Sequence, residues 1–227
     1  MAQNVGGAIP SPATNIKYHD ERASLLSQAE FPAKIPTIKG RRVAIIIRDG
    51  FDATFVNAVK TALTAAGVVP MVIGPRRRPG KSSAGGEEQP DHHFEAQRST
   101  MFDAFIIAPG TEEQAQSLAS SGRVIHWIRE AFAHCKVIAA LGPSISVLQA
   151  ALGSLPNVTF ASDQSSTDVV NSLGVITAGQ YGAAGAKVDF ASVASESKGF
   201  AGQFDYSMSR HRWYERETQG LTKQVAF

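Results

Sequence analysis

The sequence contains only one cysteine, Cys135, among its 227 residues. A single thiol excludes an internal disulfide and a zinc cluster built from several cysteines. The sequence also lacks an apolar run near the roughly 20 residues that a membrane-spanning helix needs. Its net charge of +2 gives no reason to expect nucleic acid or an anionic membrane as a partner. What is present, 43% hydrophobic and 19% charged residues, is typical of a soluble globular protein.

Sequence patterns for cofactors, metals and targeting are also missing. No G-x-G-x-x-G or Walker A pattern occurs, which excludes the usual dinucleotide and P-loop sites. His92 and His93 are adjacent, so their side chains diverge. His126 and His134 stand eight residues apart on one predicted helix, too far for a two-ligand i, i+4 site. We therefore predict no metal and no cofactor in this chain. The first residues lack the basic end and apolar centre of a signal peptide, and nothing predicts the localisation.

Apolar runs of strand length alternate with amphipathic helical segments. The runs predict strands over residues 43–47, 68–73, 102–108, 137–141 and 158–161. The helices are predicted over residues 52–66, 112–120, 124–134, 144–152 and 200–217, with Asp52 and Thr111 as N-caps of the first two. This alternation favours a mostly parallel sheet with helices on both faces. Right-handed crossovers then favour a flavodoxin-like three-layer α/β sandwich.

Residues 1–40 differ from the rest of the chain. They contain four prolines and no apolar run of strand length, which is typical of an extended arm or an interdomain linker. We therefore divide the chain into this arm, a domain over residues 41–217 and a C-terminal tail over residues 218–227. Within the domain, residues 74–93 and 178–199 are predicted as surface loops.

The loop over residues 74–93 carries a group of basic side chains. Four of them are able to bind an anion: Arg76, Arg77, Arg78 and Lys81. Acidic residues follow closely at positions 87, 88 and 91, so the composition favours a solvated loop over an anion site.

The segment from Lys136 to Leu148 is the strongest candidate for a site. It predicts a buried strand, a corner at Gly142 and Pro143, and then a helix. Many α/β hydrolases hold their nucleophile at such a corner, but Gly142 offers no reactive side chain. Ser144 follows in a sequence that lacks the second glycine of the G-x-S-x-G elbow, so we predict that it caps the helix.

Cys135 is predicted to be a packing residue and not a catalyst. It precedes the strand and lies about 20 Å from the corner, at roughly 3.3 Å per strand residue. A buried free cysteine behaves as a small apolar side chain.

Three segments between Ile38 and Gly142 carry a family resemblance that covers residues 40–152. They are Ile38 to Ala44 leading to Asp49-Gly50, Met101 to Ala104 leading to Ala108-Pro109-Gly110, and Ile138 to Gly142. In their order and spacing they resemble the PfpI/ThiJ-type, class I glutamine amidotransferase-like domain. More narrowly, the chain resembles the C-terminal domain of large-subunit haem catalases, above all fungal ones. The terminal segment His211 to Glu217 is similar to the ending of those catalases.

The resemblance implies an accessory domain without chemistry of its own. PfpI-type proteases and deglycases have a cysteine at the corner, and here Gly142 takes that place. Haem and the residues that split hydrogen peroxide would belong to the N-terminal part of such a catalase. The haem domain and sister subunits would then be partners of this chain.

Three functions follow from this interpretation. The first is an ATP-independent holdase, since PfpI/ThiJ relatives include stress-inducible chaperones, combined with stabilisation of the parent catalase. Its surface for partly unfolded clients would use terminal side chains that otherwise pack in the core: Phe200, Phe204, Tyr206, Met208, Trp213 and Tyr214. The second is a residual PfpI-type hydrolase or deglycase using Ser144 or Cys135. The third is a purely structural domain for catalase assembly.

Overall fold

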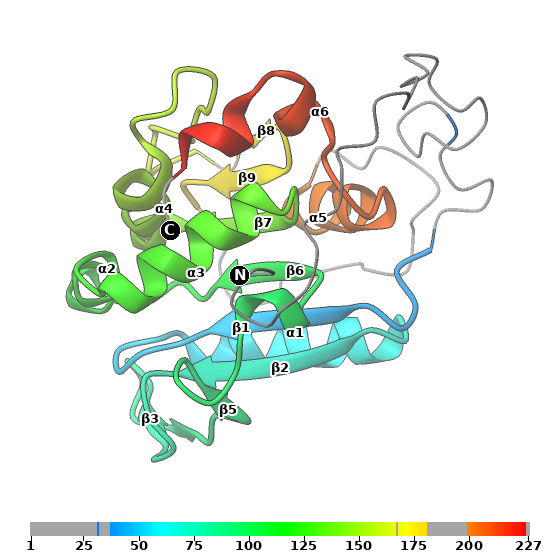
Figure 1. Cartoon of the computed structure of the whole chain (residues 1–227). Helices are drawn as coiled ribbons and strands as arrows, with labels where there is room; N and C mark the ends of the chain where they lie inside the picture. The colour runs from blue at the N-terminus through cyan, green and yellow to red at the C-terminus, as the bar shows by residue number, and fades with distance from the viewer. Residues whose placement is uncertain (1–30, 32–36, 167, 181–198, 226–227) are drawn as a thin grey trace, which may run out of the picture. The chain divides into compact units, whose positions relative to one another are not determined.

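Parallel strands form the centre of the structure, a computed structural model that describes residues 31, 37–166, 168–180 and 199–225 (Figure 1). The chain divides into two units, Met1–Pro32 and Ala33–Phe227, and the sheet belongs to the second. Seven strands pair in the order β5-β2-β1-β6-β7-β9-β8, and all pairs are parallel except β8 with β9. Their bounds are β1 Arg42–Ile46, β2 Val69–Gly74, β5 His92–His93, β6 Ala104–Ile107, β7 Val137–Leu141, β8 Val169–Ser172 and β9 Val175–Ala178.

Helices cover both faces of this sheet, which confirms the predicted three-layer α/β sandwich (Figure 1). Helices α1 and α5 pack on one face, and α2, α3 and α4 pack on the other. The bounds are α1 Ala53–Ala65, α2 Glu112–Ala119, α3 Gly122–Ala133, α4 Ile145–Leu152, α5 Phe200–Ser209 and α6 Glu215–Thr218. None of the helices in the described ranges is long and apolar enough to cross a membrane.

Successive side chains of a strand point to opposite faces of the sheet, and helices cover both faces here. The central strands are therefore continuous apolar runs in the sequence. In β1, Val43 and Ile45 pack toward α1, while Ala44 and Ile46 pack in the cluster that contains α3 and α4. All four are fully buried. A strand covered on both faces must be apolar at every position, which is the pattern that predicted β1, β2, β6 and β7.

The two predicted N-caps are confirmed. Asp52 Oδ1 accepts a hydrogen bond of 3.1 Å from the backbone N–H of Phe55, and Thr111 Oγ1 accepts one of 3.2 Å from Gln114. Both bonds satisfy donors that the first helical turn leaves unpaired.

The prediction of a strand over residues 158–161 is wrong. The backbone N–H groups of Thr159 and Ala161 donate to the hydroxyls of Ser172 and Thr177, at 3.0 and 2.8 Å, and not to a strand carbonyl. The sheet instead continues through the hairpin of β8 and β9, which the sequence analysis missed.

This hairpin lacks the usual turn signal. Its two-residue loop is Leu173-Gly174, with φ of 54° and 81°, as a type I′ turn requires. Leucine rarely adopts that conformation, and Asn171 stabilises it by accepting a 3.0 Å hydrogen bond from the Gly174 N–H.

Two further predictions need correction. The helix predicted over residues 200–217 is interrupted after α5, where His211 has a φ of +71°, and it resumes only at α6. The loop predicted over residues 74–93 contains β5 and a two-stranded hairpin of β3 (Gly80–Lys81) and β4 (Glu87–Glu88). Of the loop predicted over 178–199, residues 181–198 lie outside the described ranges.

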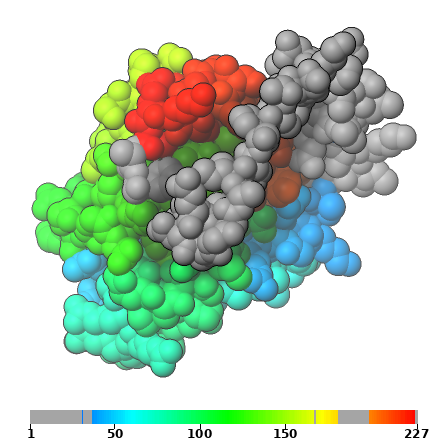
Figure 2. Space-filling model, in the orientation of Figure 1, coloured from blue at the N-terminus to red at the C-terminus, as the bar shows by residue number. Residues whose placement is uncertain are grey.

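The C-terminal residues 218–225 pack on the domain. Leu221 and Val225 are buried in the same apolar cluster as Leu155 and Val158. Figure 2 shows this contact from outside, with the C-terminal segment in red against the yellow-green segment around residue 155.

Arg216 in α6 ties this C-terminal segment to the sheet. It is fully buried, and burial lowers its pKa to about 9, so the guanidinium is still charged at neutral pH. Nε donates to Leu173 O at 2.8 Å, and Nη1 donates to Phe132 O at 3.2 Å and to Lys136 O at 2.8 Å. The guanidinium also lies 4.3 Å from the centre of the Phe132 ring. One side chain thereby joins the end of α3, the start of β7 and the β8–β9 turn.

Replacing Arg216 with alanine should therefore lower the free energy of unfolding by about 2–4 kcal/mol, because three backbone carbonyls each lose a hydrogen bond. Urea denaturation measures this loss. Arg123→Ala is the matched control, since Arg123 pairs with Glu95 on the surface at 2.7 Å and its removal should cost less than about 1 kcal/mol. Equal stability of the two variants would contradict the role assigned to Arg216.

Candidate functional site

The corner after β7 has the backbone of a nucleophile elbow without a nucleophile. Gly142 has a φ of +54° and begins a 3-10 turn, Gly142–Ser144, that leads directly into α4. A residue with a side chain is strained in this conformation, whereas glycine adopts it freely. The sequence therefore predicted the position of the corner, with glycine as its first residue.

Ser144 does not cap α4, so that prediction is wrong. Its side chain makes no cap hydrogen bond. The hydroxyl donates instead to the carbonyl of Ala108, at the end of β6, at 2.8 Å. Because Ser144 is fully buried and its proton is committed to a carbonyl, its oxygen is poorly placed to attack a substrate.

Cys135 lies just before the amino end of β7, and all five residues of this strand separate Lys136 from the corner at Gly142. Cys135 follows α3 and adopts the left-handed backbone conformation, with a φ of 57°. The N–H groups of Cys135 and Lys136 donate to the carbonyls of Phe132 and Ala131, and these bonds end the helix. The side chain of Cys135 is only 4% exposed, and burial raises the pKa of its thiol. The thiol form, which is the weaker nucleophile, is thus favoured at neutral pH.

In doubly wound sheets ligands bind where strand order reverses, which here is between β1 and β6. This crevice is closed by the loops after the two strands. The N–H of Asp52 donates to Pro109 O at 2.8 Å, and the N–H of Thr111 donates to Gly50 O at 3.0 Å. Phe51, between these bonds, is fully buried.

Gly110 is what allows the two loops to approach this closely. A Cβ atom at this position would lie 2.3 Å from Gly50 O and 2.8 Å from Phe51 Cα. Backbone atoms cannot move aside as a flexible side chain can, so no other residue fits without separating the loops.

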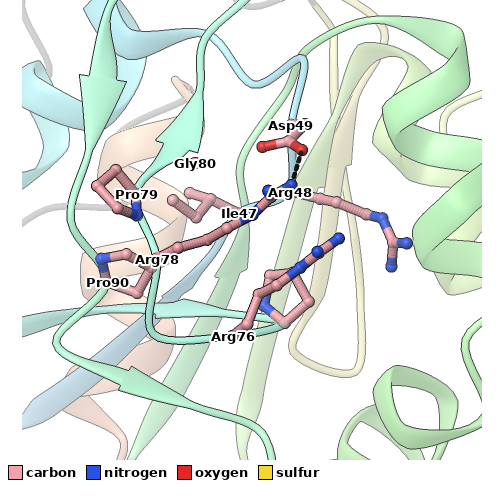
Figure 3. A pocket seen from close by; sticks show the side chains of 9 residues that line it. Ile47, Arg48, Asp49, Arg76, Arg78, Pro79, Gly80 and Pro90 are labelled. Atoms are coloured by element: carbon pink, nitrogen blue, oxygen red, sulfur yellow. Dashed lines mark ion pairs between the residues drawn. The ribbon is translucent and has the colours of Figure 1, made fainter.

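A shallow pocket lies beside the closed crevice, at the carboxyl ends of β1 and β2 (Figure 3). It is lined by Ile47, Arg48, Asp49, Pro75, Arg76, Arg78, Pro79, Gly80 and Pro90, and we call it the arginine pocket. Its enclosed volume of about 10 Å³ is room for about one water molecule, far below that of a drug-sized ligand site.

Arg76 and Arg78 were among the predicted anion-binding candidates, whereas Arg48 was not. Arg48 follows β1, and the parallel pairing of Ile46 with Ile73 brings it beside the residues that follow β2. Both strands were predicted, so their pairing was the signal that could have placed these arginines together.

The aromatic candidates for client binding divide into two groups. Phe204 and Met208 are buried in the apolar cluster that contains α1. These two side chains therefore pack in the core, which is the alternative to client binding. The other four side chains are partly exposed: Phe200, Tyr206, Trp213 and Tyr214.

The titratable side chains that the structure describes are mostly scattered. Within the described ranges, no three His, Cys, Asp or Glu side chains lie close enough together to hold an ion. The main charged cluster is at the amino edge of the sheet, where Asp103 lies 3.5 Å from Arg41, 3.8 Å from Arg212 and 4.0 Å from His211. Burial, followed by the charge of Arg212, lowers the pKa of His211, so this imidazole is mostly neutral at pH 7.

The fold places this domain in a known structural class. DJ-1beta of Drosophila melanogaster superposes with a TM-score of 0.59 at 18% identity, over 83% of this chain and 100% of that chain. A ThiJ/PfpI family protein from Pseudomonas syringae gives a TM-score of 0.57 at 17% identity, over 91% of this chain and 83% of that one. At such identities the likeness shows the fold alone, a flavodoxin-like α/β domain of the DJ-1/ThiJ/PfpI type.

Sequence similarity narrows the class to a family. The family model for the C-terminal domain found in long catalases matches residues 39–218, and the chain belongs to this family. Catalase-1 of Neurospora crassa is 41% identical over 227 residues, which are the whole of this chain and 30% of catalase-1. The chain therefore spans less than a third of the length of that relative. The resemblance to fungal large-subunit catalases is confirmed.

Closure of the crevice is testable through Gly110. Gly110→Ala should lower the free energy of unfolding by about 2–3 kcal/mol, because the added methyl forces the two loops apart. Hydrogen exchange at the amides of Asp52 and Thr111 should become faster. Gly122→Ala is the control, since no atom lies within 4 Å of its added Cβ and the change should be neutral or mildly stabilising. Unchanged exchange in Gly110→Ala would refute the closure.

Proposed function

We propose that this chain is a non-catalytic domain of a haem catalase and that it stabilises the parent protein. The observation that carries the proposal is the closed crevice between β1 and β6 at the carboxyl edge of the sheet, where Phe51 is buried, together with Gly142 at the corner after β7. Membership of the family of C-terminal domains of long catalases supplies the context. Haem and peroxide chemistry then belong to the parent's N-terminal part, and the haem domain and sister subunits are the partners. Residues 41–217 form the packing domain in this proposal, and residues 1–40 connect it.

A chimaera tests the stabilising role. The corresponding 30% of Neurospora crassa catalase-1 is replaced by this chain, and the chimaera is compared with a truncated catalase-1 that lacks the region. The chimaera should assemble as catalase-1 does and keep its peroxide-degrading activity longer on heating than the truncated form. The Arg216→Ala chimaera should lose part of that gain, since its added domain is less stable.

Equal heat inactivation of the chimaera and the truncated catalase would contradict the proposal. Size-exclusion chromatography separates a failure of assembly from a failure of stabilisation, and the haem absorbance verifies that all forms carry the same cofactor load.

A second candidate function is an ATP-independent holdase. Helix α5 and the turn after it present four partly exposed aromatic side chains, Phe200, Tyr206, Trp213 and Tyr214, on one short stretch of chain. Such apolar surface is suited to partly unfolded clients. Buried Phe204 and Met208 would hold the helix in place, with the Phe200 and Phe204 rings stacked at 6.4 Å between centroids.

We expect the chain to suppress the heat-induced aggregation of a client enzyme at near-equimolar amounts without ATP, as followed by light scattering. The double variant Phe200→Ser, Tyr206→Ser should protect at least about twofold less, because it removes partly exposed apolar area. Met101→Ser is the control, since Met101 is 46% exposed but lies outside the aromatic group. No protection at severalfold molar excess would exclude the holdase function.

The residual hydrolase is the least supported of the three hypotheses. The hydroxyl proton of Ser144 is committed to the Ala108 carbonyl, and Cys135 lies at the end of β7 opposite to the corner.

A further inference from the structure

We propose that the arginine pocket binds a small phosphate-type oxyanion through Arg48, Arg76 and Arg78. This site is independent of the stabilising and holdase functions, because it lies at the carboxyl ends of β1 and β2 and shares no residue with α5, α6 or the corner at Gly142.

The charges that line the pocket do not balance. Asp49 is its one acidic residue, and it lies 3.6 Å from the guanidinium of Arg78. Asp49 Oδ1 is further engaged by the N–H of Lys81 at 2.9 Å. Among the described residues, neither Arg48 nor Arg76 forms an ion pair, so about two positive charges remain for a ligand.

The acidic residues that follow in the sequence do not neutralise these arginines. Glu88 forms an ion pair with Lys60 of α1 at 2.5 Å. Asp91 accepts a 2.7 Å hydrogen bond from the backbone N–H of Val72 in β2. The composition of this segment favoured a solvated loop of mixed charge, but Glu88 and Asp91 are engaged by α1 and β2, and Glu87 lies opposite Lys81 in the β3–β4 hairpin.

Figure 3 shows how the three arginines lie. The side chains of Arg48 and Arg76 extend toward the same side of the pocket, and Arg78 reaches Asp49 across it. Two guanidinium groups that start from adjacent parallel strands are thereby presented together. Planar guanidinium groups bind phosphate oxygens through two parallel N–H donors, which a lysine cannot do.

The walls of the pocket are rigid. Pro75, Pro79 and Pro90 fix the backbone dihedral φ at three positions around it. Pro90 packs so closely on Gly74, at the end of β2, that a Cβ on Gly74 would lie 2.7 Å from its ring. Rigid walls reduce the entropy lost when the arginines bind a ligand.

The size of the pocket limits the ligand. About 10 Å³ accommodates one anionic oxygen, while the rest of the ion lies at the open mouth among the guanidinium groups. The site therefore fits inorganic phosphate or a terminal phosphate group, and its walls have no room for a nucleobase or a haem.

Titration of the full chain with inorganic phosphate at constant ionic strength tests the proposal, with binding followed by calorimetry and by the NMR signals of the arginine Nε–H groups. We expect saturable binding with a dissociation constant on the order of 1 mM. Arg48→Gln and Arg76→Gln should each weaken it about tenfold, the loss of one charge-assisted contact.

Arg77→Gln is the matched control. It removes the same charge from the neighbouring position, but Arg77 does not line the pocket, so affinity should change less than about twofold. All three side chains lie at the surface of the domain, and thermal melting verifies that the variants fold.

O-phospho-L-serine in place of phosphate distinguishes the sources of the group. Binding of both ions supports recognition of a phosphate group on a larger molecule, and binding of phosphate alone supports a site for the free ion. Absence of saturable phosphate binding by the unaltered chain, or an equal loss of affinity in Arg77→Gln and Arg76→Gln, would overturn the proposal.

Discussion

The structure depends on one buried guanidinium. Arg216 donates to the carbonyls of Phe132, Lys136 and Leu173, which belong to three elements that precede it by 43 to 84 residues. A charge removed from water is costly unless its hydrogen bonds are satisfied. Here three backbone carbonyls accept from Nε and Nη1, while Nη2 has no hydrogen-bond partner among the described residues. Burial of α6 therefore depends on α3, β7 and the β8–β9 turn staying together. Lys136 follows the same rule, because its ammonium donates to Ser99 O at 2.9 Å and burial lowers its pKa to about 8.

The two edges of the sheet are held in different ways. The amino edge is tied to the C-terminal segment by Arg216 and by the charged cluster around Asp103, and the Lys136 ammonium ties it to Ser99 before β6. The carboxyl edge, where doubly wound folds bind ligands, is closed at its centre by the hydrogen bonds of Gly50 and Asp52. The open part of that edge is the arginine pocket, beside β2. A domain of this kind suits packing and small-ion binding better than catalysis on an organic substrate.

Most of the fold could be predicted because its determinants are local. Strands buried on both faces read as unbroken apolar runs, and the caps Asp52 and Thr111 act within one helical turn. Elements were missed where the usual local residue type is lacking. The β8–β9 turn uses Leu173 where a turn usually has asparagine or glycine, and the break at His211 has neither glycine nor proline to announce it. At the candidate site, the glycine at the corner after β7 could be predicted, but the engagement of Glu88 and Asp91 away from the arginines depends on contacts with α1 and β2.

The partner of Ser144 explains why the elbow persists without its nucleophile. At the end of β6 the chain leaves the sheet, and the carbonyl of Ala108 is buried. A buried carbonyl without a donor costs about 1–3 kcal/mol. Here it accepts hydrogen bonds from the Ser144 hydroxyl at 2.8 Å and from Gln114 Nε2 at 3.1 Å. Ser144 reaches this carbonyl only because Gly142, at a φ of +54°, turns the chain sharply after β7. The corner is thus required by a hydrogen bond in the core, and this requirement remains whether or not a reactive side chain stands at its apex.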